Sequence, residues 1–287
     1  MIPVLLSGCS LLPGQGSTGE PGSQPSPAAP TSAPTSTEPT SAVPTSTGPS
    51  PIPSATAATA APTVPDVTIS TFPTVAVPTA DPTEKGLRVR KTTIRGRSAG
   101  ASWTISIPVF SGAPVAKEVN RRVRAAANDL IAQVRREAKG DAGAKRTLTG
   151  VGTVVTNDRR TIQVTIIFSD YLAGTAHPAN AVTTTVIDVD KSRPVLLTQV
   201  IQNPPEGLRF LKAQVVKAAK KKREPVDKAG LAPKVANWAN WQTTPAGLTF
   251  YFGDYELGGY GLRRYTVPWR SARLVLSEYG ENLLAPQ

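Results

Sequence analysis

The first 84 residues contain almost nothing from which a folded core could be built. Residues 10–84 consist mainly of Pro, Ser, Thr, Ala and Gly, with Phe72 as the only aromatic residue and no Lys or Arg. A segment of this composition cannot bury enough apolar surface to offset the entropy lost on ordering. Its prolines favour extended polyproline II stretches of about 3.1 Å per residue. We therefore expect a disordered stalk over residues 10–84 and a folded domain over residues 85–287.

The single cysteine, Cys9, ends the run Leu6-Ser7-Gly8-Cys9, which has the pattern of a bacterial lipobox. In such a box the cysteine becomes the mature N-terminus and carries lipid. Only residues 1–6 precede the box, and they include no Lys or Arg. This segment is shorter than the apolar region of about 7–15 residues that a signal peptide needs. Either the true start lies upstream, or the match is chance and Cys9 is a free cysteine in the tail. We expect residues 1–9 to be a truncated lipoprotein signal.

Lipid on Cys9 would anchor the protein to the extracytoplasmic face of the cell membrane; otherwise it would be secreted. The sequence has no run of about 18 apolar residues, so we expect no membrane-spanning helix. One cysteine allows no internal disulfide. One cysteine and one histidine cannot form a transition-metal cluster, so no metal or cofactor is expected.

Charge follows the same boundary. The first 81 residues contain four acidic residues and no basic one, giving −4, whereas the whole chain carries +12, which leaves +16 for the rest. A field of this sign concentrates anions near the protein. In a cell envelope these would be phospholipid head groups, teichoic-type polymers and acidic glycans. Nucleic acid is the usual partner of a basic domain, but the exported location argues against it.

Hydrophobic periodicity predicts an α+β domain in which an antiparallel sheet packs against two main helices. The clearest helix has apolar residues every three or four positions from Val115 to Val134, with Pro114 in its first turn and Gly140 at its end. A second helix fits residues 206–223. Strands are expected in seven segments: 87–94, 103–107 ended by Pro108, 148–156, 161–168, 182–189, 248–252 and 265–267.

Two groups of side chains are ligand-binding candidates. The densest basic run lies at the end of the second helix and comprises Lys217, Lys220, Lys221, Lys222 and Arg223. It is either a solvated helix C-terminus, where the dipole favours cations, or an anion-binding patch. Trp238 and Trp241 would share a face if they lie on a helix. They either pack in the core or, if exposed, stack on sugars or a protein partner.

The only histidine, His177, would have to serve in any Ser/His/Asp triad. Ser169 and Asp170 lie close to it in sequence, but no serine has a Gly-x-Ser-x-Gly surrounding. We therefore interpret His177 as a structural residue and expect no catalytic residue. A pair of glycosidase carboxylates need not be close in sequence, so this alternative stays open.

Two segments resemble motifs of a known family: residues 250–261 (FYFGDYELGGYG) with 265–269 (YTVPW), and residues 171–178 (YLAGTAHP). They are similar to the closing motif and the YxGGxHP loop of the RsiV-like extracytoplasmic domains. The resemblance covers about residues 85–284. The sequence departs from the family pattern at two places. Ala173 stands where the family commonly has glycine, and Lys191-Ser192 stands where the family's Asp-x-x-Thr-Gly turn has Thr-Gly. The motif residues of interest are Tyr171, Gly174, His177 and Pro178 in the loop, and Tyr255 and Tyr260 as ligand-binding candidates.

The resemblance implies an extracytoplasmic binding role. The family includes an anti-sigma factor whose outer domain binds lysozyme, and similar domains accompany a peptidoglycan deacetylase or occur in secreted mycobacterial antigens. A domain of charge +16 would repel a cationic lysozyme. We expect a non-catalytic, envelope-anchored binding domain that recognises an anionic cell-wall polymer or an extracellular protein. A hydrolase acting on cell-wall or lipid substrates is the alternative.

Overall fold

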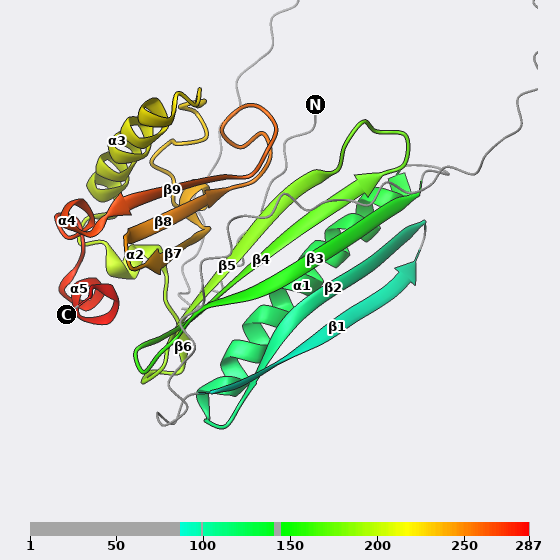
Figure 1. The fold of residues 1–287 in the computed structure, drawn as a ribbon, viewed down its shortest axis with the longest axis horizontal. Helices are drawn as coiled ribbons and strands as arrows, with labels where there is room; N and C mark the ends of the chain where they lie inside the picture. The colour runs from blue at the N-terminus through cyan, green and yellow to red at the C-terminus, as the bar shows by residue number, and fades with distance from the viewer. Residues whose placement is uncertain (1–86, 99, 141–144, 287) are drawn as a thin grey trace, which may run out of the picture. The chain divides into compact units, whose positions relative to one another are not determined.

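The computed structural model describes residues 87–98, 100–140 and 145–286, which belong to one unit of the chain. The predictions for the lipobox, for Cys9 and for the stalk lie outside the described residues. The predicted α+β class is confirmed (Figure 1). The elements in chain order are β1 (Arg88–Ser98), β2 (Ala101–Ser111), α1 (Val115–Gly140), β3 (Arg146–Asn157), β4 (Thr161–Leu172), β5 (Ala179–Asp188), β6 (Arg193–Pro194), α2 (Leu197–Val200), α3 (Pro204–Lys222), η1 (Val235–Trp238), β7 (Trp241–Thr244), β8 (Gly247–Phe252), β9 (Arg263–Pro268), α4 (Trp269–Ala272) and α5 (Glu278–Leu284).

Strands β1 to β6 form one sheet in the order of the chain. Neighbouring strands are antiparallel except for β2 and β3, which are parallel. The sequence interpretation had an antiparallel meander and missed this parallel pair. The reason is α1, whose 26 residues span about 39 Å. A strand the length of β3 spans about 40 Å, so α1 returns the chain to the end of the sheet from which β2 started.

The prediction that Pro108 ends its strand was wrong, because β2 continues to Ser111. Pairing with β3 stops at Ser106, while pairing with β1 continues past Pro108. Pro108 therefore lies where β2 has a partner on one side only, and a residue without an N–H is tolerated there.

Helix α1 covers one face of the six-stranded sheet. Its apolar stripe packs against alternate strand residues such as Ile105, Leu148 and Phe168, as the 3.6-residue periodicity predicted. Because side chains alternate across a strand, residues 95, 97, 102, 104, 147 and 149 point to the opposite face. We call the part of this face formed by β1, β2 and β3 the open face.

A second, three-stranded antiparallel sheet of β7, β8 and β9 packs with α3 around its own core. Trp238 and Trp241 belong to this core and are only 1% and 3% exposed. They do not share a helix: Trp238 ends η1 and Trp241 begins β7. Of the two alternatives for this pair, packing in the core is therefore the one observed. Because both side chains are buried, neither can stack on a ligand at the surface.

Buried polar side chains join the two sheets over β4 and β7. The Thr243 backbone N–H donates to Gln163 Oε1 at 2.8 Å, and Gln163 Nε2 donates to the Thr243 hydroxyl at 2.5 Å. The Thr165 hydroxyl donates to Gln242. Because an unpaired buried polar group costs free energy, such bonds specify how β7 lies on β4. This contact covers part of β4, whereas side chains on the same face of β1 to β3 are exposed, among them Arg95, Arg97, Thr104, Thr147 and Val151.

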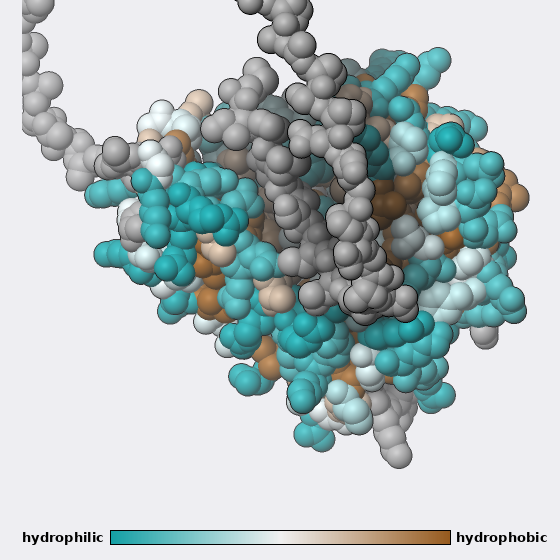
Figure 2. Space-filling view, turned by 180° about the vertical axis from the view of Figure 1, so that it is seen from behind, coloured by the Kyte–Doolittle hydropathy of each residue, from teal (hydrophilic) through white to brown (hydrophobic). Residues whose placement is uncertain are grey.

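Two surface properties bear on function. Within the described ranges, no helix combines the length and apolar character that a membrane crossing requires. The view from behind shows a mainly hydrophilic surface in which hydrophobic residues occupy separate areas (Figure 2).

Candidate functional site

Two loops that are far apart in sequence meet through an exposed group of three rings. The first loop, residues 173–178, joins β4 to β5 and carries His177; we call it the histidine loop. The second, residues 253–262, joins β8 to β9 and carries Tyr255 and Tyr260; we call it the tyrosine loop. The three rings together form the His–Tyr cluster. The structure thus brings the two motif segments of the sequence into one site.

The rings of the His–Tyr cluster contact one another directly. The His177 ring centre lies 4.1 Å from that of Tyr260 and 6.5 Å from that of Tyr255. The Tyr255 hydroxyl lies 3.3 Å from His177 Nε2. Tyr255 is 57% exposed and Tyr260 is 49% exposed. Large aromatic side chains with this much free surface, and with polar atoms at their edges, can stack on a ligand and hydrogen-bond to it.

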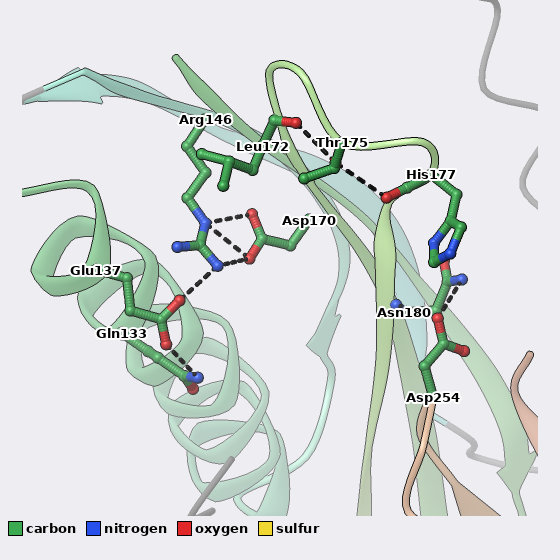
Figure 3. Close-up of polar contacts among 9 residues, drawn as sticks. All are labelled: Gln133, Glu137, Arg146, Asp170, Leu172, Thr175, His177, Asn180 and Asp254. Carbon is green, nitrogen blue, oxygen red and sulfur yellow. Dashed lines mark hydrogen bonds and ion pairs between the residues drawn. The ribbon is translucent and has the colours of Figure 1, made fainter. Parts of the chain in front are cut away.

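Asn180 on β5 and Asp254 in the tyrosine loop position the cluster (Figure 3). One carboxylate oxygen of Asp254 accepts hydrogen bonds from the Asn180 backbone N–H at 2.9 Å and from its side-chain amide at 3.0 Å. The Asp254 N–H donates back to the Asn180 carbonyl at 3.0 Å. The same Asn180 amide donates to the Tyr260 hydroxyl at 3.2 Å. Charge-assisted bonds of this kind are among the stronger hydrogen bonds in proteins.

The tyrosine loop holds Tyr255 in an unfavourable backbone conformation. Its φ is +65°, in the left-handed region that favours glycine. Gly258, Gly259 and Gly261 nearby also have positive φ, which costs glycine little. Tyr255 is fixed by its N–H, which donates to the Gly259 carbonyl at 2.9 Å. A non-glycine residue in such a conformation costs about 1–3 kcal/mol, and such residues cluster at functional sites.

The underside of the tyrosine loop packs closely on the segment before η1. The Leu257 carbonyl accepts a hydrogen bond from the Asp227 N–H at 2.8 Å, and a Cβ on Gly230 would lie 1.8 Å from the Glu256 carbonyl oxygen. Burial raises the pKa of the Glu256 carboxyl, although a hydrogen bond from Gly253 N–H lowers it in part. Glu256 thus points inward while its neighbour Tyr255 points to solvent.

The histidine loop is closed by its own polar contacts. Thr175 donates from its hydroxyl to the Leu172 carbonyl at 2.8 Å and lies 3.2 Å from the His177 carbonyl. Gly174 adopts a φ of +94° in this turn. The loop motif predicted from the sequence therefore forms a compact turn, with His177 at its exposed end.

An ion-pair group anchors the strand that enters the histidine loop (Figure 3). Arg146 on β3 lies 2.7 Å from Asp170 on β4 and 2.5 Å from Glu137 on α1. Gln133 donates to Glu137 at 2.9 Å. Asp170 is thus engaged with the guanidinium on the α1 side of the sheet.

Among the described residues, the His177 ring forms no hydrogen bond with a serine or a carboxylate. Its Nδ1 lies 3.1 Å from the Pro178 carbonyl, and its Nε2 faces the Tyr255 hydroxyl. Ser169, a possible nucleophile by sequence distance, is buried in β4. Within the described ranges, no three His, Cys, Asp or Glu side chains are grouped as metal ligands.

The basic run lies at the C-terminus of α3. Its five residues, Lys217, Lys220, Lys221, Lys222 and Arg223, are all exposed. Arg223 caps the helix with a φ of +59°. Lys222 Nζ donates to the Arg264 carbonyl at 3.1 Å and lies 5.1 Å from the Tyr265 ring centre. These positions are those of a solvated helix C-terminus, the first of the two interpretations of this run. Binding of anions by the run stays a prediction.

Solved structures share this fold. A member of the DUF3298 family from Bacteroides fragilis NCTC 9343 superposes with a TM-score of 0.51 at 13% identity, covering 69% of this chain and 97% of its own. A DUF3298 family protein from Pseudomonas aeruginosa PAO1 has a TM-score of 0.50 at 12% identity, covering 70% of this chain and 98% of its own. No protein-family model matches the sequence, and no curated protein matches it. At these identities the likeness shows the fold alone, which is that of an uncharacterised domain family.

Sequence reasoning missed the two residues that hold the site together, Asn180 and Asp254. Asp254 follows Gly253 after a strand, where Asp commonly accepts backbone hydrogen bonds in turns, so its role had a local signal. Asn180 had none, because its partners lie 74 and 80 residues further along the chain.

Proposed function

We propose that this chain is a non-catalytic binding domain of the cell envelope that recognises an anionic cell-wall polymer through the His–Tyr cluster. The observation that carries the proposal is the exposed ring cluster, built from two distant loops. Tyr255 is held there in a left-handed conformation, and residues in such conformations cluster at functional sites.

Three further features support this role. The +16 charge of residues 82–287 favours an anionic ligand. The similarity of both site loops to RsiV-like motifs supports an extracytoplasmic binding domain. The lipobox pattern supports a lipid anchor at Cys9 and a position outside the cell membrane. A hydrolase remains the alternative, and the described contacts of His177 give it no support.

The test is co-sedimentation of the full chain with purified cell walls at low and high salt. We expect the wild type to pellet, and the double variant Tyr255→Ala/Tyr260→Ala to lose about tenfold in affinity, since about 1.4 kcal/mol of lost contact corresponds to a factor of ten. Leu274→Ala is the matched control, because Leu274 is 66% exposed and lies outside the cluster. It should bind like the wild type.

Salt then separates the kinds of contact. Binding that vanishes at high salt indicates that charge dominates, whereas binding that persists indicates a shaped site with which soluble glycan fragments should compete. If the wild type fails to pellet at either salt concentration, the polymer proposal is wrong and an extracellular protein becomes the leading partner. If the double variant pellets like the wild type, the cluster is not the site.

A further inference from the structure

The open face of the sheet is cationic and rich in hydroxyl groups. Strands β1, β2 and β3 contain no Asp or Glu, and three basic residues of β1, Lys91, Arg95 and Arg97, alternate to this face. Arg95 and Arg97 point to this face, since they alternate with Ile94, which packs toward α1. Both are exposed, and among the described residues their guanidinium groups form no hydrogen bond or ion pair. Their Cα atoms are separated by about 7 Å along the strand.

Rows of hydroxyl side chains lead from these arginines across the sheet. Arg97 is opposite Ser102 on β2, and Ser102 is opposite Thr147 on β3, with their hydroxyl oxygens 3.5 Å apart. Thr147 is in turn opposite Tyr171, the last residue of β4 but one and the first residue of the loop motif. This row therefore ends at the entry to the histidine loop.

The neighbouring row ends at the residue that positions the cluster. Arg95 is opposite Thr104, which is opposite Thr149. In register, the row continues through Ser169 on β4, which is buried and offers no hydroxyl to a ligand, to Asn180 on β5, whose amide bonds to Asp254 and to the Tyr260 hydroxyl. Four interstrand spacings, about 19 Å in all, separate β1 from β5. Guanidinium groups without a partner among the described residues, the hydroxyls of β2 and β3 and the His–Tyr cluster thus lie along one direction on one face.

We propose that the open face binds an acidic polysaccharide lying across the strands, with its carboxylates on Arg95 and Arg97 and a sugar ring on the His–Tyr cluster. This inference rests on the proposed function and names its ligand class and path. The arginine fork matches carboxylate geometry, the Ser and Thr hydroxyls both donate to and accept from sugar hydroxyls, and exposed aromatic rings pack on sugar faces.

The chemistry favours a polysaccharide over a polyanion without sugars. A polymer of phosphates alone would engage the arginines but would leave the hydroxyl rows and the rings without matching partners. A neutral glycan would leave both guanidinium groups unpaired. β1 is the edge strand of the described sheet, and charged side chains on an edge strand also prevent pairing with the edge of another sheet. The experiment separates these roles.

The test measures binding of the full chain to polygalacturonate, which has one carboxylate per sugar, beside neutral dextran and inorganic polyphosphate. We expect polygalacturonate to bind most tightly. The variant Arg95→Gln/Arg97→Gln should weaken that binding about tenfold, because each lost contact is charge-assisted, and should reduce its salt dependence. The control Lys117→Gln/Arg124→Gln removes the same charge from exposed positions on α1, the opposite side of the sheet, and should change affinity by no more than about twofold.

The outcomes are distinguishable. If the arginine variant binds like the wild type while Tyr255→Ala/Tyr260→Ala does not, the sheet path is wrong and the proposed function stands. If the tyrosine variant also binds like the wild type, both are wrong. If polyphosphate binds as tightly and the α1 control weakens binding equally, only diffuse charge acts and the inference fails. If the arginine variant self-associates but binds polygalacturonate normally, β1 protects the sheet edge and the inference fails.

Discussion

The left-handed backbone of Tyr255 makes two replacements of this residue informative together. Both Tyr255→Ala and Tyr255→Gly remove the ring, which is 57% exposed, and differ only in how well the new residue tolerates a φ of +65°. A left-handed conformation costs a non-glycine residue about 1–2 kcal/mol. Glycine avoids this cost but loses about 0.5–1 kcal/mol through its greater freedom in the unfolded chain. The glycine variant should therefore be more stable than the alanine variant by about 0.5–1 kcal/mol.

Binding should respond differently from stability. Since both variants lack the ring, both should lose affinity for cell walls to the same extent, about tenfold. The free energy of unfolding comes from denaturant titrations followed by tryptophan fluorescence, with Trp238 and Trp241 in the core as reporters. Tyr255→Phe is the control: it keeps the ring and loses only the hydroxyl contact with His177, so most of the affinity should remain.

Two results would refute this reasoning. An alanine variant as stable as the glycine variant would show that Tyr255 is not strained in solution. A difference in affinity between the two variants that follows their difference in stability would show that the ring acts through the fold of the loop and not through contact with ligand.

Three further perturbations have expected outcomes. Gly230→Ala should destabilise the domain by about 1–3 kcal/mol, as overpacking does, and weaken wall binding, because the new Cβ would displace the Glu256 carbonyl and with it the tyrosine loop. Asp254→Asn should cost about 1–3 kcal/mol in unfolding free energy and weaken binding, since an amide cannot accept every hydrogen bond of the carboxylate. Burial and the hydrogen bond to Asp188 raise the pKa of Tyr279 to about 12. Its stabilising contribution is therefore complete below about pH 10, the pKa of an unfolded tyrosine, and is lost as the pH rises toward 12, so wild-type unfolding free energy should fall more steeply over this range than that of Tyr279→Phe.

These predictions have matched controls. Gly140→Ala adds the same methyl group where no atom lies within 4 Å; it should leave binding unchanged and raise the unfolding free energy by no more than about 0.5–1 kcal/mol. If Gly230→Ala and Gly140→Ala changed stability and binding equally, the close packing of Gly230 on the tyrosine loop would not be what holds that loop in place. An Asp254→Asn protein with wild-type stability would show that the bond to Asn180 does not hold the loops together. If the unfolding free energy of Tyr279→Phe depended on pH as that of the wild type does, the ionisation of Tyr279 would not account for the loss of stability at high pH.

Local patterns in the sequence were sufficient for much of the fold. The three- and four-residue spacing from Val115 to Val134 predicted α1, and the structure confirms it. The seven expected strands were placed to within a few residues, because alternation and β-branched composition are local signals, but the short strands β6 and β7 were not predicted. The end of β2 was wrong because the effect of Pro108 depends on whether a neighbouring strand needs its N–H, which the chain beside it does not reveal.

The candidate site was visible in the sequence only as two separate motifs. His177 and Tyr260 are 83 positions apart by number, and nothing in their spacing indicates that their ring centres lie 4.1 Å apart. The tertiary structure decided that contact through the hydrogen bonds between Asn180 and Asp254. The tertiary structure also buried Trp238 and Trp241 in the second hydrophobic core, whereas the rings of the His–Tyr cluster stay exposed.

By itself, the sequence determined where a fold can form, which segments become helices and strands, and the sign of the domain's charge, because composition and periodicity act over a few residues. Long-range packing set the remaining relations: β3 lies parallel to β2, β7 packs on β4, and Arg95, Arg97 and the His–Tyr cluster share one face. The physical reason is that these relations depend on which strands pair and which faces become buried. Such choices are made by contacts between residues far apart in the chain.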